Sequence, residues 1–224
     1  MTPEQNALFD LVTWDFPGAA IEAESFRRIE AEVPPEQRAR FSPSEWHIAR
    51  RLVHTTADFE ILPHLRFHGD PVGAGRAALR RGALIYSDSN MIKAGLSVPK
   101  LKRFHPGYTR DSILCEVASP DVAELAKREN ITRALAAVKL HEHELGGSIF
   151  LCGNAPLALA GMIRMIVEGG PRPALIVGMP VGFVNVLESK ELLKLVDVPY
   201  ITLEGRRGGS PLAVAALHAV MEDF

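Results

Sequence analysis

The sequence predicts a single α/β domain with three layers, in which helices cover both faces of a mostly parallel sheet. Two observations indicate this architecture. Short apolar runs lack the polar alternation of a half-exposed strand, and helix starts lie between them. The chain has 224 residues, of which 47% are hydrophobic and 23% charged, the balance of an ordinary globular protein. This length is sufficient to bury a sizeable core.

Five short apolar runs are predicted to be strands, because each is bounded by polar or glycine-rich segments. They cover residues 83–86, 113–115, 149–152, 174–177 and 200–203. In open α/β sheets, ligands bind at the carboxyl ends of the strands. The loops directly after these runs are therefore the first places to look for a site.

Four helix starts separate the strands, each made of a capping residue followed by proline at the first helical position. The capping residues are Ser42, Asp70, Ser119 and Ser210. Ser42 and Glu45 also have the spacing of a capping box, which predicts a helix over about 43–55.

Polar residues after two of the strands have a simple structural interpretation. Asp88 and Asn90 are expected to start a short helix that stops near Gly95. Asn154 precedes Pro156 and an apolar helical segment, so it is expected to cap that helix. Taken alone, these residues indicate helix capping rather than binding.

Composition excludes several classes of protein. The formal net charge is −2, so bulk charge does not indicate a nucleic-acid partner. No basic segment with an apolar run opens the chain and no long uncharged apolar stretch occurs, so we expect a cytoplasmic protein with no membrane anchor. Cys115 and Cys152 match no zinc or redox spacing and are predicted to be reduced and buried.

The loop 204–210 is a candidate anion site, because its glycines let backbone N–H groups approach an anion ahead of a helix. Arg206 and Arg207 add positive charge. The loop lacks the G-x-G-x-x-G and G-K-[ST] patterns of nucleotide-binding loops. Anion recognition and a plain surface turn are both open at this point.

Histidines give one candidate acid and one weak candidate metal site. His54 lies near the end of the helix predicted over 43–55, where the helix C-terminus favours the imidazolium form. Asp58 would favour the same form if the helix continued. A lone histidine on such a helix is more often structural, and Arg133 is equally well explained as a solvated charge at a helix start. His141 and His143 are two residues apart, which places them on different helical faces and argues against a metal site.

Ordered blocks along the chain carry a family resemblance. They run from 21–26 and 53–59 through 73–75, 88–95 and 132–133 to 153–159, 178–184, 188–190 and 205–210. In sequence and order these blocks resemble the precorrin-8X and cobalt-precorrin-8 methylmutases. Leu157 departs from the pattern, in which threonine is expected. Residues before Pro17 match no block, so we expect an N-terminal extension over 1–16 and a methylmutase-like domain over 17–224.

The resemblance implies an isomerase of cobalamin biosynthesis that moves a methyl group from C-11 to C-12 of the tetrapyrrole by a 1,5-sigmatropic shift, giving hydrogenobyrinate or cobyrinate. It implies no cofactor and no protein-bound metal, because any cobalt belongs to the substrate. It further implies a homodimer and a histidine acid that corresponds to His54. Candidate contacts for the substrate are Ser25, Asp88, Asn90, Arg133, Asn154, Arg206 and Arg207.

Two other classes of function compete with the isomerase. A tetrapyrrole-binding carrier would hold the corrin product without chemistry, and retention of His54 argues against it. A nucleotide-binding α/β protein is disfavoured by the missing phosphate-loop pattern.

Overall fold

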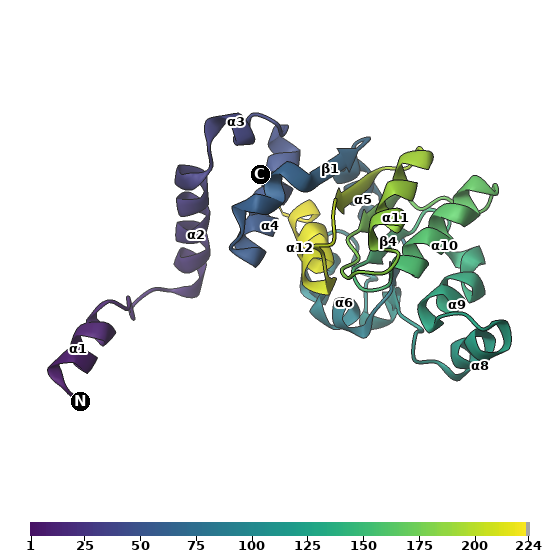
Figure 1. The fold of residues 1–224 in the computed structure, drawn as a ribbon, viewed down its shortest axis with the longest axis horizontal. Helices are drawn as coiled ribbons and strands as arrows, with labels where there is room; N and C mark the ends of the chain where they lie inside the picture. The colour runs from purple at the N-terminus through teal and green to yellow at the C-terminus, as the bar shows by residue number, and fades with distance from the viewer. Residues whose placement is uncertain (223–224) are drawn as a thin grey trace.

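The computed structural model describes residues 1–222, and its centre is one six-stranded sheet (Figure 1). The strand order is β1-β6-β5-β4-β2-β3, with β1 antiparallel to β6 and the other neighbours parallel. The strands are β1 Leu65–His68, β2 Ile85–Ser87, β3 Ile113–Leu114, β4 Ile149–Cys152, β5 Leu175–Gly178 and β6 Tyr200–Leu203.

Helices surround the sheet and include four short 3₁₀ turns. The α-helices are α1 Pro3–Asp10, α2 Gly18–Glu32, α3 Pro35–Arg38, α4 Pro43–Thr56, α5 Pro71–Arg80, α6 Asn90–Gly95, α7 Val98–Lys102, α8 Pro120–Glu129, α9 Arg133–Leu140, α10 Pro156–Val167, α11 Val186–Glu191 and α12 Ser210–Val220. The 3₁₀ turns are η1 Phe59–His64, η2 Arg110–Ser112, η3 Glu142–Glu144 and η4 Leu192–Leu195.

Alternating strand residues build two separate cores, because successive side chains point to opposite faces of a sheet. In β4, Ile149 and Leu151 pack with α4, α5, α6 and α12, whereas Phe150 and Cys152 pack with α9, α10 and η4. All four residues are fully buried. Figure 1 shows these two helical layers on opposite sides of the sheet. The predicted three-layer α/β/α fold with a mostly parallel sheet is confirmed.

All five predicted strands are present, with bounds within two residues of the prediction. The sequence did not indicate β1, the four-residue edge strand Leu65–His68. Its Arg66 and His68 interrupt any apolar run, and it follows directly on the 3₁₀ turn η1. The strand exists because it pairs with β6, a partner more than 130 residues away that local patterning does not reveal.

Three of the four predicted cap-and-proline starts occur as expected. Ser42 and Glu45 form the full capping box of α4, and Asp70 and Ser119 cap α5 and α8. The fourth differs, since Gly209 is the cap and Ser210 is already the first residue of α12.

The two capping expectations for the strand-end loops also need correction. Ser89, rather than Asp88 or Asn90, caps α6, which does stop at Gly95. Ala155 occupies the cap position of α10, so Asn154 does not cap it. For α6, Asp88 does not act as the cap because its carboxylate accepts backbone N–H groups of the loop after β4, as described below.

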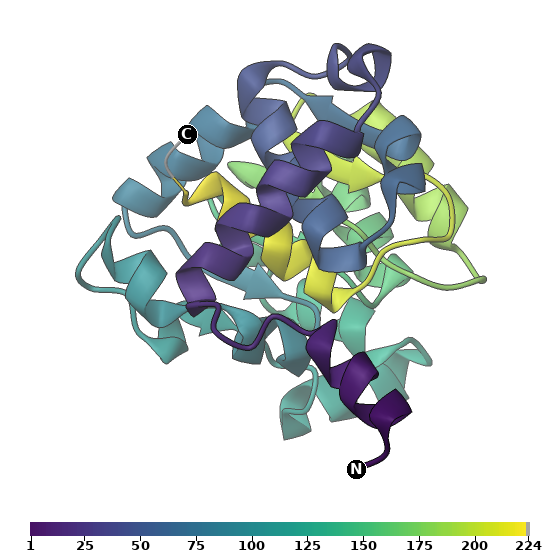
Figure 2. The same cartoon turned by 90° about the vertical axis from the view of Figure 1, so that its left-hand side faces the viewer.

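The N-terminal segment adds two helices outside the layers, of which α2 packs on α4. Figures 1 and 2 show α2 on the outer side of α4, and α1 projecting away from the domain. All the side chains of α1 are exposed. Within residues 1–222, no helix is long and apolar enough to cross a membrane.

Candidate active site

Four loops converge at the carboxyl edge of the sheet and are joined by hydrogen bonds. The Met179 N–H donates to the carbonyl oxygen of Cys152 (2.7 Å), and the Gly209 N–H donates to that of Met179 (2.8 Å). The hydroxyls of Ser89 and Ser210 lie 2.8 Å apart, which joins the start of α6 to the start of α12. The loops after β2, β4, β5 and β6 therefore form one surface.

Two glycines permit this close packing. A Cβ on Gly153 would lie 2.7 Å from the Cα of Ser210, and one on Gly208 would lie 2.3 Å from the carbonyl oxygen of Met179. Neither contact is possible for a real side chain without a backbone shift. The glycines in the blocks 153–159 and 205–210 thus keep the loops in contact.

Asp88 fixes the loop after β4 from the neighbouring strand. Its side chain is 1% exposed, and its carboxylate accepts the backbone N–H groups of Gly153 (3.1 Å), Asn154 (2.7 Å) and Ala155 (2.6 Å). The thiol of Cys152 donates to the same carboxylate over 3.3 Å. Burial raises the pKa of Asp88, and the backbone N–H donors oppose that shift. The carboxylate thus holds the three residues that lead into α10.

Lys190 holds the next loop in a similar way. Its side chain is 3% exposed, and its ammonium donates to the carbonyl oxygens of Gly205 (2.8 Å) and Arg207 (2.7 Å). Burial lowers the pKa of Lys190 to about 8. Sequence reasoning gave this lysine no role. Its place in the family block 188–190, in a helix that packs on the core, was the available signal.

His54 lies in the last turn of α4, at the same edge. The helix ends because Ala57 adopts a left-handed conformation (φ 52°). The imidazole is partly buried, and the ring of Phe26 from α2 lies 5.2 Å away, centroid to centroid. Since the helix has ended, Asp58 does not continue it and instead pairs with Arg207 (3.2 Å). The expected support of His54 by Asp58 along a helix is therefore wrong.

A cavity of about 380 Å³ opens beside the last turn of α4. Thr55, the neighbour of His54, lines it together with residues along α6 and α12. His218 also lines it, and burial lowers the pKa of that imidazole to about 4, so it is neutral near pH 7. The lining residues are Arg51, Thr55, Met91, Gly95, Ser210, Pro211, Val214, Ala215 and His218.

The two adjacent arginines have different surroundings. Arg207 forms ion pairs with Asp58 (3.2 Å) and Glu60 (2.9 Å), which join the loop to the segment after α4. These carboxylates raise the pKa of Arg207, and the hydrogen bond that Arg207 donates to Glu60 has the larger effect. Arg206 is exposed and lies over the ring of Phe183, 5.4 Å from its centroid.

Comparison with known proteins agrees with this arrangement. The sequence profile of the family described as precorrin-8X methylmutase matches residues 20–223. The chain belongs to this family. It is 40% identical over 200 residues to the cobalt-precorrin-8 methylmutase of Priestia megaterium, covering 89% of this chain and 85% of that protein. It is 38% identical over 205 residues to the precorrin-8X methylmutase of Pseudomonas aeruginosa, covering 91% and 94%.

Solved structures give the same result for the fold. The precorrin-8X methylmutase of Thermus thermophilus superposes with a TM-score of 0.80 at 45% identity, covering 91% of this chain and 95% of that one. The methylmutase is thus an isomerase of cobalamin biosynthesis that catalyses the methyl migration of the corrin pathway. This outcome confirms the predicted isomerase and decides against the carrier and nucleotide-binding alternatives.

The other predicted contact residues of the methylmutase occupy varied positions. Asn90 and Asn154 are exposed at the carboxyl edge. Ser25 lies next to Phe26 on α2, and its hydroxyl donates to the carbonyl oxygen of Ile21 (2.9 Å). Arg133 is exposed at the first position of α9, in the helical layer across the sheet from α4. The fold thus brings His54, Asn90, Asn154 and the two arginines to one edge, and leaves Arg133 on another layer.

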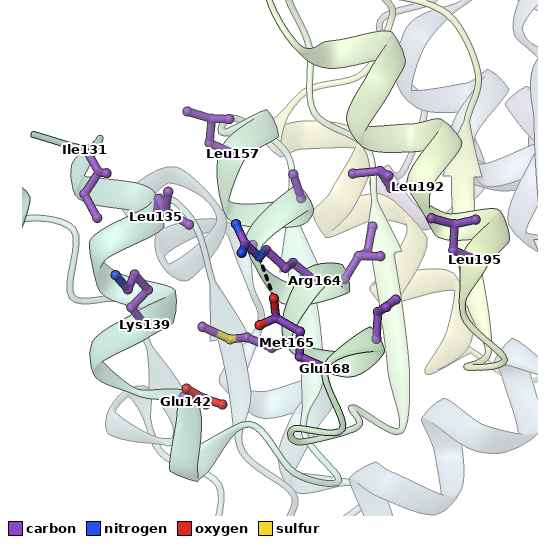
Figure 3. Close-up of a pocket in the computed structure, with 14 residues that line it drawn as sticks. Ile131, Leu135, Lys139, Glu142, Leu157, Arg164, Met165, Glu168, Leu192 and Leu195 are labelled. Carbon is purple, nitrogen blue, oxygen red and sulfur yellow. Dashed lines mark hydrogen bonds and ion pairs between the residues drawn. The ribbon is translucent and has the colours of Figure 1, made fainter. Parts of the chain in front are cut away.

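A larger groove of the methylmutase, about 800 Å³, lies between α9, α10 and η4 (Figure 3). Its walls are mostly apolar, and Arg164 at its centre is paired with Glu168 (2.8 Å). Leu157, the departure from the family pattern, lines its upper end. The groove lies in the layer opposite His54, and its lining residues in the described part of the chain include no histidine.

The cysteines and the histidine pair 141 and 143 form no metal site. Cys115 and Cys152 are buried free thiols, as predicted. His141 pairs with Glu144 (2.7 Å), and His143 is exposed. Across the part of the chain that the structure describes, no group of three or more metal-ligating side chains comes together.

Proposed function

We propose that this methylmutase moves the methyl group from C-11 to C-12 of its tetrapyrrole with His54 as the proton donor. The observation that carries the proposal is the position of His54, at the end of α4 beside the cavity and the loops of the carboxyl edge. The ring contact with Phe26 restricts the imidazole.

The reaction requires little chemistry from the protein. A 1,5-sigmatropic shift breaks and forms carbon–carbon bonds within one conjugated system, so it needs neither an electron acceptor nor a protein nucleophile. A proton placed on that system makes the rearranging form accessible, and a single acid suffices. The remaining rate enhancement comes from holding the flexible macrocycle in its reactive shape.

Recognition of the substrate is assigned to the loops of the carboxyl edge. Carboxylate side chains of a tetrapyrrole need charged or backbone donors. Arg206 and the exposed amides of Asn90 and Asn154 supply them there, and Arg207, which is already paired with Asp58 and Glu60, adds positive charge beside them. Asp88 acts through the backbone of 153–155, which it positions. Ser25 on α2 and Arg133 at the start of α9 are proposed as contacts at the periphery of the substrate.

The family resemblance supports a homodimer with the substrate near the subunit interface. Light scattering at micromolar concentration tests this, and a monomer with full activity would rule out a site that needs both subunits. The two free thiols fit a reducing compartment, and we place the enzyme in the cytoplasm.

The test of the acid compares two histidine variants. His54→Ala is expected to fold and to bind the tetrapyrrole, while conversion of precorrin-8X or cobalt-precorrin-8 falls by roughly 10²–10⁴-fold. His143→Ala, which removes an exposed histidine of η3, serves as the matched control and is expected to retain activity. The absorbance change to the corrin chromophore measures turnover. Conversion by His54→Ala near the parent rate would refute the assignment.

A further inference from the structure

The loop between β5 and α11 presents apolar side chains to solvent beside the active-site edge. Phe183 is 83% exposed and Val184 is 76% exposed. Gly182 (φ 139°) and Asn185 (φ 62°) have positive φ angles on either side of this pair, which fixes the turn that directs it outward. Contiguous exposed apolar patches mark binding surfaces more often than isolated apolar side chains do.

The same loop is joined to the arginine loop after β6. The Gly182 N–H donates to the carbonyl oxygen of Arg206 (3.3 Å). The guanidinium of Arg206 lies over the ring of Phe183 at 5.4 Å, within the range of a cation–π contact. The backbone beneath Arg206 is held on both sides by Lys190, through Gly205 and Arg207. Phe183 and Arg206 thus form one unit.

Charge distinguishes Arg206 from its neighbour. Arg207 is committed to Asp58 and Glu60, so its positive charge is already compensated. Within the described residues 1–222, Arg206 has no carboxylate partner. An exposed guanidinium that is positioned by an aromatic ring and has no acid beside it is free to bind an anion.

We propose that Phe183 and Arg206 form a substrate-binding pair, in which the ring contacts the apolar face of the macrocycle and the guanidinium binds one peripheral carboxylate. The substrate has both features, a conjugated ring system and carboxylate side chains. Arg207 then serves as a tether between the loop and the segment after α4. The proposal rests on the proposed function only for the chemistry of this substrate, and not on the identity of the acid.

Binding of hydrogenobyrinate, followed by absorbance titration, tests the pair without requiring turnover. Arg206→Ala is expected to raise its Kd about 10- to 100-fold, the range for loss of a charge-assisted contact. Phe183→Ala is expected to raise the Kd severalfold. Phe183→Leu is expected to raise it less, because leucine keeps apolar area, but not to leave it unchanged, because leucine has no ring to hold the guanidinium. The Kd of the double alanine variant is expected to rise by less than the product of the two single-variant factors.

Two further measurements separate this role from others. For the forward reaction, KM is expected to rise in both single variants with kcat nearly unchanged, as for an interaction made equally in ground and transition states. Leu8→Ala removes an exposed apolar side chain of α1, which projects away from the domain, and is the matched control, with Kd and KM unchanged.

Three outcomes would overturn the proposal. These are an unchanged Kd in Phe183→Ala, strictly multiplicative effects in the double variant, and a shift of oligomeric state in Phe183→Ala measured by light scattering, which would make the loop a contact between copies. A wrong assignment of the acid gives a different result, namely turnover by His54→Ala with hydrogenobyrinate binding intact.

Discussion

Removing the Asp88 carboxylate is expected to destabilise the protein by about 3–5 kcal/mol. The carboxylate accepts three backbone N–H groups, at 2.6, 2.7 and 3.1 Å, in a site that is 1% exposed. In Asp88→Ala each donor loses its acceptor, at about 1–3 kcal/mol per buried group. Relief of the buried charge and entry of water offset part of the loss, so the total stays below the sum.

Urea unfolding measures the effect, with Asp88→Asn as the graded control. With an m-value of about 2 kcal/mol per M, the midpoint for Asp88→Ala falls by about 1.5–2.5 M. In Asp88→Asn, the amide oxygen still accepts from Asn154 and Ala155 while the NH₂ group faces the donor of Gly153. The free energy of unfolding of Asp88→Asn is therefore expected to fall by about half as much as that of Asp88→Ala. If Asp88→Ala cost less than about 1 kcal/mol at unchanged m, the carboxylate would not be holding this loop.

Two further predictions concern the other buried groups of the edge. Lys190→Met leaves the carbonyl oxygens of Gly205 and Arg207 without their donor, so its Tm in calorimetry should fall by about 3–8 °C. Lys194 is an exposed lysine nearby, and the control variant Lys194→Met should have a nearly unchanged Tm. Burial lowers the pKa of His218 from about 6.5 to about 4 in the folded protein. The contribution of neutral His218 to the free energy of unfolding is therefore fully present above pH 6.5 and is lost as the pH drops towards 4. The partly buried site reduces this loss to about 1–2 kcal/mol, and His218→Gln, whose amide oxygen can accept the Ser97 N–H, should flatten the profile in urea unfolding series.

Local signals were sufficient to predict most of the fold. A capping residue followed by proline specifies a helix start within a few residues, which is why the starts of α4, α5 and α8 agree with the prediction. Buried strands are likewise continuous apolar runs. By contrast, β1 depends on pairing with β6, and its alternating polar residues gave no comparable signal.

The site was less predictable, because chemically similar residues differ in what surrounds them. Arg206 and Arg207 are neighbours in the sequence, yet one lies over an aromatic ring and the other between two carboxylates. Asp88 was expected to contact the substrate through its side chain, but three backbone donors from a different strand-end loop converge on it. Such convergence depends on the sheet order, in which β2 and β4 are neighbours.

The buried and exposed polar groups of the carboxyl edge have different roles in binding. Asp88, Lys190 and the Ser89–Ser210 pair hold backbone segments from inside, which leaves exposed groups such as Asn154 and Arg206 available to the substrate. A flexible polycarboxylated ring loses conformational freedom on binding, and rigid loops reduce the additional ordering that the protein must undergo. Substituting one of these internal groups is therefore expected to lower kcat/KM without removing any substrate contact. Only variants that raise Kd while the free energy of unfolding stays constant identify residues that touch the tetrapyrrole.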